Sequence, residues 1–212
     1  PGWEVCDPEH PVGQEILEIG RRNGLNDSGG KMKYDQTIIT PKGLTVHIRN
    51  GVASNGSTVL ENFNLTHAET DYLLSYPDEN HFDAEQESRY LERKAASPNE
   101  IELIAFVNGK VAGTAGIEAI GAHYKVAHRA EFGISILKDY WGLGIGRALM
   151  EACIQCARTA GYTQLELDVV AENARAISMY QTAGFVEYGR NPKGFRSRNA
   201  GFQELISMRL EL

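Results

Sequence analysis

The clearest feature of the sequence is a set of short runs in which apolar and polar residues alternate. Residues 163–170 are typical, since leucine or valine takes every second position and the residues between them are acidic. Alternation of this kind places one row of side chains in a core and the other in water, which predicts a β-strand. The runs that predict strands are 44–48, 101–107, 111–117, 130–137, 163–170, 185–188 and 205–210.

Other stretches repeat apolar residues every three or four positions, which predicts amphipathic helices. One of them begins near Gly146 and runs for about 15 residues. Asn173 is a suitable N-cap for a further helix, and Gly184 stands where a glycine often follows a helix end. Residues 57–96 have helical spacing broken by Pro77, so we expect two helices there.

The order of these elements predicts a mixed sheet. Asn108 and Gly109 join two predicted strands and are typical of a type I′ turn, in which both central residues need a positive φ. Those two strands therefore form an antiparallel hairpin. The strands at 130–137 and 163–170 are separated by a helix, an order that produces parallel strands. We therefore expect an α/β fold with a mixed sheet.

Composition and charge narrow the function classes. The chain has 212 residues, a mass of 23.4 kDa and a formal net charge of −7. Such an acidic balance argues against a nucleic-acid-binding protein, because phosphate contacts need a basic surface. Apolar runs are far shorter than the roughly 20 residues that span a bilayer, so no membrane segment is expected. Three cysteines form no disulfide framework, which favours the cytoplasm.

The first residues differ from the rest. Residues 1–31 are broken by proline and glycine and show little periodicity, whereas the orderly patterns begin shortly afterwards. We therefore expect an N-terminal extension at 1–31 and one domain at 32–212.

A glycine-dense turn, Trp141-Gly-Leu-Gly-Ile-Gly146, lies between a predicted strand and a predicted helix. Backbone N–H groups at the start of a helix form a binding site for an anion such as a phosphate. The dinucleotide fingerprint G-x-G-x-x-G fails here because its third glycine position is Arg147. A P-loop fails as well, since no Gly-Lys-Ser/Thr follows.

Two motifs together resemble the GNAT superfamily of acyl-CoA-dependent N-acetyltransferases. The glycine turn is similar to the family pattern Gln/Arg-x-x-Gly-x-Gly/Ala, with Trp141 in place of the first residue. Further along, Asn173-Ala-Arg-Ala-Ile-Ser-Met-Tyr-Gln-Thr-Ala-Gly-Phe185 is similar to the pattern Asn-x-x-Ala-x-x-x-Tyr-x-x-x-Gly-Phe. The resemblance extends over residues 44–212. It implies a mixed, mostly antiparallel sheet with splayed parallel strands and flanking helices.

The resemblance also implies acetyl-CoA as cosubstrate, without a metal. In this family the strand before the glycine turn pairs with the pantetheine arm, the turn holds the pyrophosphate, and an asparagine reaches the pantetheine. On that basis Ile136 N–H polarises the thioester carbonyl as an oxyanion donor. The residues that the resemblance places at the cofactor are Ile134, Ser135, Ile136, Gly142, Leu143, Gly144, Ile145, Gly146, Arg147 and Asn173.

Three residues are candidates for the proton transfers. The resemblance makes Tyr180 the general acid that protonates the departing thiolate. The acceptor arrives as an ammonium group and needs a base. Glu131 and Asp168 lie on the polar side of neighbouring predicted strands, and Asp168 matches the base of relatives that acetylate ribosomal proteins. We favour Glu131 slightly, because its side chain is longer.

The expected activity is N-acetyl transfer to a primary amine of a small molecule or amino acid, by direct attack in a ternary complex. Two alternatives remain open: a non-catalytic acyl-CoA sensor and a protein N-terminal acetyltransferase. Residues 69–92 contain eight acidic residues, which suit either a cationic acceptor or a solvated helix face. Acetyl-CoA and the amine are the expected partners, and a homodimer is compatible with this interpretation.

Overall fold

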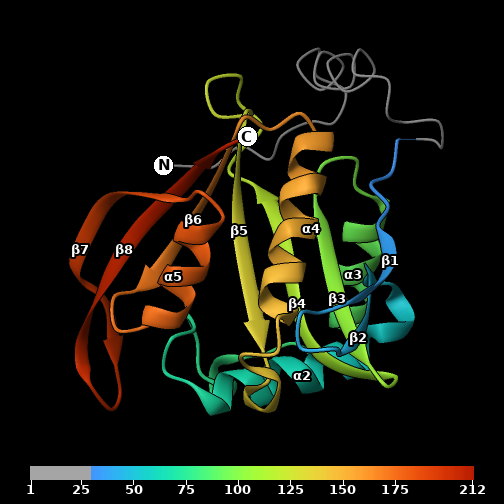
Figure 1. Cartoon of the computed structure of the whole chain (residues 1–212), viewed down its shortest axis with the longest axis horizontal. Coiled ribbons are helices and arrows are strands. Elements are labelled where there is room, and N and C mark those ends of the chain that lie inside the picture. The colour runs from blue at the N-terminus through green and yellow to red at the C-terminus, as the bar shows by residue number, and fades with distance from the viewer. Residues whose placement is uncertain (1–29) are drawn as a thin grey trace.

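The computed structural model describes residues 30–212 and forms one open, eight-stranded sheet with helices on both faces (Figure 1). Seven neighbouring pairs give the order β1-β2-β3-β4-β5-β6-β8-β7, in which only β5 and β6 run parallel. The mixed, mostly antiparallel sheet that the sequence predicts is therefore confirmed. The strands are β1 Asp35–Ile39, β2 Thr45–Asn50, β3 Ile101–Val107, β4 Lys110–Ala119, β5 Arg129–Ile136, β6 Gln164–Val170, β7 Val186–Ser197 and β8 Gly201–Glu211.

The helices form two layers. In Figure 1, α4 and α5 lie in front of the sheet, while α2 and α3 lie behind it. The helices are α2 Gly56–Glu69, α3 Ala84–Ala96, α4 Ile145–Thr159 and α5 Ala174–Thr182, and the short 3-10 turns are η1 Ala53–Asn55, η2 Pro77–Glu79 and η3 Lys138–Tyr140. No helix in residues 30–212 is long and apolar enough to cross a bilayer.

The turn and the two helix-end residues that the sequence predicts are present in the structure. Asn108 and Gly109 both have positive φ, 50° and 77°, as the type I′ turn between β3 and β4 requires. Asn173 caps α5 by accepting a hydrogen bond from Ala176 N at 3.2 Å. Gly184 follows α5 with a φ of 99°. These three signals are local, so the sequence alone could reveal them.

At the edges of the sheet, the sequence patterns predict fewer and shorter strands than the structure has. Strand β1 was not predicted, because most of its side chains are exposed and it shows no apolar alternation. The last hairpin is longer than predicted: β7 has 12 residues and β8 has 11. Edge strand β7 is largely exposed, so most of it carries no buried face for a pattern to reveal.

The core lies between the sheet and α4. Buried residues of α4 pack against β3, β4 and β5. Cys153 and Cys156 belong to this buried set, at 0% and 3% exposure, and they are packed as small hydrophobic side chains. The residues predicted as an extension, 1–31, lie outside the described part of the chain except for Gly30 and Lys31.

Strands β5 and β6 separate after a short parallel contact. Their register extends over three residue pairs, from Arg129 opposite Gln164 to Glu131 opposite Glu166. Beyond that point β6 continues to pair with β8, and β5 continues to pair with β4. The two strands diverge toward the bottom of Figure 1, which opens the sheet between them.

Candidate functional site

A cavity of about 570 Å³ lies where β5 and β6 diverge. Its wall combines the end of β5, the glycine turn, the start of α5 and the loop after α2. The lining residues are Thr70, Tyr72, Leu73, Ile134, Ser135, Ile136, Tyr140, Trp141, Gly142, Gly144, Gly146, Arg147, Glu172, Asn173, Ala174, Arg175, Ala176, Met179 and Tyr180. Most residues predicted at the cofactor are brought together here; Leu143 and Ile145 lie within the turn but do not line the cavity.

The free edge of β5 presents main-chain groups to this cavity. Successive residues in an antiparallel pair point their N–H and C=O groups to alternate sides. Leu137 N donates to Ala112 O at 3.0 Å, toward β4, so Ile134 and Ile136 face the opposite, open side. The carbonyl of Ile136 accepts a hydrogen bond from Trp141 Nε1 at 2.7 Å. Because Ile136 faces the open side, its N–H does not pair with β4 and remains available at that edge.

The glycine turn provides a row of further donors. Gly144 is the N-cap of α4 with a φ of 91°, and Ala148 N makes the first hydrogen bond back to the Gly144 carbonyl. Within residues 30–212, the backbone N–H groups of 142–147 donate to no protein acceptor. Six successive donors at the positive end of a helix dipole form a site suited to a phosphate group.

At two of the turn glycines a side chain would be in tight contact with its neighbours. A Cβ on Gly144 would lie 3.1 Å from Thr40 Cβ, and the positive φ adds strain. A Cβ on Gly146 would lie 3.1 Å from Ile136 Cδ1 and 3.2 Å from the sulfur of Met179. The close approach of backbone to neighbouring elements therefore explains these glycines.

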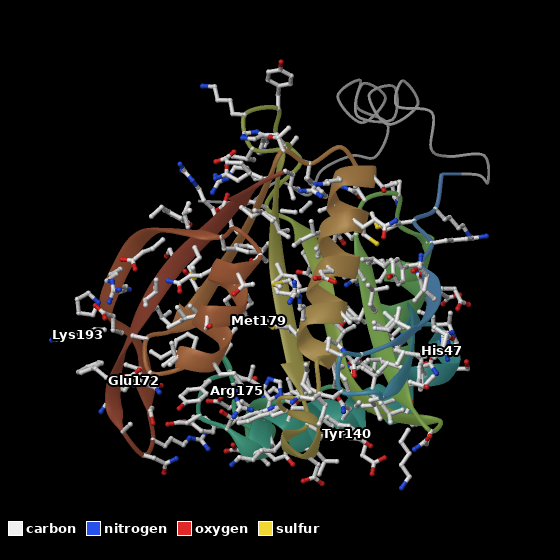
Figure 2. The ribbon with its side chains drawn as sticks, in the orientation of Figure 1. His47, Tyr140, Glu172, Arg175, Met179 and Lys193 are labelled. Atoms are coloured by element: carbon white, nitrogen blue, oxygen red, sulfur yellow. The ribbon has the colours of Figure 1, made fainter. Side chains whose placement is uncertain are left out.

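Three charged side chains line the cavity: Arg147 of α4, and Glu172 and Arg175 at the start of α5, which are labelled in Figure 2. Arg147 pairs with Glu151 at 2.9 Å on the surface of α4. The guanidinium of Arg175 lies over the ring of Trp141, 5.1 Å from its centroid. Among the described residues, Glu172 is the one carboxylate that lines the cavity. No sequence pattern singled out Arg175 or Glu172, although both lie within two residues of the predicted Asn173.

Asn173 has a double use. Its side-chain oxygen accepts the cap hydrogen bond from Ala176 N, and its side chain also lines the cavity. The oxygen is engaged, so the amide NH₂ remains as the donor toward a ligand.

Tyr180 of α5 lines the cavity and is almost fully buried. It is 6% exposed and contacts Phe132 edge-on and Phe185 at a tilt. Burial raises the pKa of Tyr180 well above its ordinary value, so the phenol stays protonated at neutral pH. No hydrogen bond of its hydroxyl is present within residues 30–212, so this phenol is a candidate proton donor in the lining of the cavity.

Glu131 and Asp168 lie beside the divergence, and neither lines the cavity. Their positions in the register place both on the sheet face that also carries Glu118 and Glu166. Burial raises the pKa of Glu131, and the nearby charges of Asp168, Glu118 and Glu166 raise it further. Asp168 accepts a hydrogen bond from Ser207 Oγ at 2.6 Å. The raised pKa of Glu131 makes its carboxylate a stronger base than an ordinary glutamate.

The acidic residues of 69–92 do not line the cavity either. Several have protein partners instead: Asp78 and Glu79 bind Arg198, Glu85 binds Arg89, and Glu69 accepts from Lys138 N. Within the described residues, no group of three or more His, Cys, Asp or Glu side chains is arranged to hold a metal ion.

Comparisons with known proteins identify a family and similar folds. A model of the acetyltransferase (GNAT) family matches residues 65–185, a range that contains the glycine turn and Asn173–Phe185. The chain is 30% identical over 118 residues to the L-amino acid N-acetyltransferase AaaT of Escherichia coli, covering 55% of this chain and 72% of that protein. It is 43% identical over 56 residues to the [Ribosomal protein bS18]-alanine N-acetyltransferase of the same species, covering 26% and 38%.

Solved structures of acetyltransferases have a similar fold. A GNAT-family acetyltransferase from Streptococcus pneumoniae superimposes with a TM-score of 0.75 at 30% identity, covering 79% of this chain and 99% of the other. The acetyltransferase yncA from Salmonella typhimurium, solved with its cofactor acetyl-CoA, superimposes with a TM-score of 0.69 at 20% identity, covering 79% and 94%.

Proposed function

Because the chain belongs to the GNAT family of acetyltransferases, we propose that it transfers the acetyl group of acetyl-CoA to a primary amine. The acceptor is a small molecule or an amino acid, which attacks the thioester directly in a ternary complex. The observation that carries this proposal is the cavity at the divergence of β5 and β6, which is lined by the open edge of β5 and by the glycine turn, whose N–H groups have no protein acceptor within the described residues.

The donor site follows from these groups. The backbone N–H groups of 142–147 suit the pyrophosphate of acetyl-CoA, and Arg147 and Arg175 add positive charge nearby. The open edge of β5 at Ile134–Ile136 can pair with the amides of the pantetheine arm as an added strand. Asn173 supplies a side-chain amide from the opposite wall. The arm then leads the thioester toward Tyr180.

The chemistry needs stabilisation of one negative charge and movement of two protons. As the amine attacks, the thioester oxygen gains charge, and the N–H of Ile136 is the donor at the strand edge for it. Collapse of the tetrahedral intermediate breaks the C–S bond and releases a thiolate. The buried phenol of Tyr180 is protonated and gives its proton to that sulfur, and the resulting phenolate regains a proton from the nitrogen of the new amide. The burial that raises the pKa of the phenol also raises the pKa of a thiol released into the same site, so the two pKa values shift in the same direction.

Proton removal from the ammonium is assigned to Glu131, with Asp168 as the second candidate. The raised pKa of Glu131 makes its carboxylate a better proton acceptor than an ordinary glutamate. Since it does not line the cavity, we expect one water molecule to connect it to the amine.

A binding and turnover experiment tests the proposal. Thermal shift with coenzyme A, acetyl-CoA and NAD should show stabilisation by the first two alone. Thiol release from acetyl-CoA should then depend on an added amine. Binding without turnover of any amine, amino acid or N-terminal peptide would favour the sensor alternative, and turnover of peptides alone would favour the N-terminal acetyltransferase.

A further inference from the structure

The loop after α2 is held against the turn between β7 and β8, although the two segments lie more than 115 residues apart. We call this set of contacts the loop clasp; it joins Asp71, Tyr76, Asp78 and Glu79 of the loop to Ser197, Arg198 and Gln203 of the hairpin. None of these residues has a place in the transfer chemistry described above. The clasp therefore needs an explanation of its own.

Asp71 is the centre of the clasp. Its carboxylate accepts hydrogen bonds from Ser197 Oγ on one oxygen and from Tyr76 OH, at 2.7 Å, on the other. Its backbone carbonyl accepts from Gln203 Nε2 at 3.2 Å. Ser197 and Gln203 are 8% and 5% exposed, so these contacts lie in a protected environment where each hydrogen bond restricts the loop strongly.

Arg198 forms the outer part of the clasp. Its guanidinium binds Asp78 at 2.7 Å and lies 4.2 Å from the ring centroid of Tyr76. Its backbone N–H donates to Tyr76 OH at 2.9 Å. The acidic side chains of the loop are thus directed at the hairpin and away from the cavity.

The loop directs a different set of residues inward. Thr70, Tyr72 and Leu73, on both sides of Asp71, line the cavity. This wall is uncharged, and within the described residues Glu172 alone contributes a carboxylate to the cavity. Arg147 and Arg175 also line the cavity, so its lining carries one carboxylate and two guanidinium groups. The further ammonium groups of a polyamine or an aminoglycoside would therefore meet no second carboxylate in that lining.

We propose that the loop clasp fixes Tyr72 and Leu73 as the acceptor wall, and so selects amines with one ammonium group and an apolar substituent. In this role Asp71 is a positioning residue, because it acts on the acceptor through its neighbours. The proposal rests on the proposed acetyl transfer, since it concerns the acceptor of that reaction.

Two matched pairs of acceptors test the selectivity: hexylamine against 1,6-diaminohexane, and L-norleucine against L-lysine. Within each pair the length is similar and one member carries an extra ammonium group. We expect kcat/KM to be at least about tenfold higher for the singly charged member of the pair that reacts. Replacing Leu73→Asp should reduce that ratio by supplying a second carboxylate. Equal or better turnover of the doubly charged members would overturn the selectivity.

The clasp itself is tested by Asp71→Asn and Arg198→Gln. If Tyr72 and Leu73 are no longer held in position, KM for the acceptor should rise by about 10–100-fold while KM for acetyl-CoA stays unchanged. Arg190→Gln is the matched control: this arginine of the same hairpin binds Glu187 and Glu204 and makes no contact with the loop. An equal rise in both KM values, or the same effect in the control, would show a general structural role instead.

If none of the four amines is acetylated by a chain that binds acetyl-CoA, the result contradicts the proposed transfer to small amines and, with it, this inference.

Discussion

Tyr180 shows how one residue combines packing with chemistry. Its ring contacts Phe132 and Phe185 in the core, while its hydroxyl reaches the cavity. The packing would remain with phenylalanine, which differs by the hydroxyl alone. The two contributions can therefore be separated by a single substitution.

We predict that Tyr180→Phe lowers kcat by about 10²–10⁴ while the affinity for acetyl-CoA is retained. The melting temperature should change little, because the aromatic contacts persist. Steady-state kinetics and calorimetric titration of coenzyme A measure the two quantities. An unchanged kcat would mean that Tyr180 only packs, with water as the acid.

The base is predicted from the electrostatics of Glu131. Its pKa is raised, so the acidic limb of kcat/KM should lie above the ordinary carboxylate pKa of roughly 4.3. Glu131→Gln should remove this limb, lower kcat/KM most near neutral pH and recover part of it at high pH, where more of the amine is already neutral. Asp168→Asn should give the same pattern more weakly.

The pH profiles of the two variants decide between these carboxylates. A larger effect of Asp168→Asn would reverse the assignment. Profiles unaltered in both variants would assign proton removal to solvent.

At the scale of elements, the turn into α4 matters because its backbone, and not its side chains, faces the ligand. We predict that Gly146→Val abolishes coenzyme A binding, since the added atoms meet Ile136 and Met179 at the cavity wall. Gly144→Ala should also reduce binding, because positive φ and Thr40 both oppose a side chain there.

A glycine at the other end of the same helix provides the control. Gly161 also has a positive φ, 86°, but an added Cβ would meet nothing within 4 Å. Gly161→Ala should therefore cost about 1–2 kcal/mol of unfolding free energy and leave the affinity for coenzyme A unchanged. Thermal melts with and without coenzyme A separate the two effects. Normal binding by Gly146→Val would contradict the pyrophosphate site.

At the scale of the whole molecule, a buried group couples stability to pH. Glu102 of β3 lies beneath α3 beside Gly116, and burial raises its pKa to about 7. A raised pKa in the folded state means that the folded protein binds the proton more tightly than the unfolded chain does. The contribution to stability is therefore complete below about pH 4.3 and is lost as pH rises through 7.

We predict that the melting temperature falls between pH 5 and pH 8 and that Glu102→Gln reduces this fall. Glutamine keeps the size of the side chain and cannot ionise. Thermal melts across that range measure the difference between the two proteins. An identical pH dependence in both would show that Glu102 does not titrate there. Glu85→Gln is a suitable control, since that exposed residue makes one pair along α3.

The sequence by itself determined several features that depend on neighbouring residues. The alternating runs, the turn at Asn108 and Gly109, the cap at Asn173 and the spacing of the two motifs are local, and the fold class and family follow from them. Strand β1 escaped prediction because an exposed edge strand buries too little to leave a pattern.

Only the tertiary structure decided which residues meet across long distances in the sequence. It brought Thr70, Tyr72 and Leu73 to the cavity and directed the neighbouring acids to Arg198 and Ser197 instead. It also placed Glu131 and Asp168 beside the divergence of β5 and β6 rather than in the wall. The reason is physical: which partner a charged side chain finds depends on how distant segments pack, and composition and spacing carry no record of that packing.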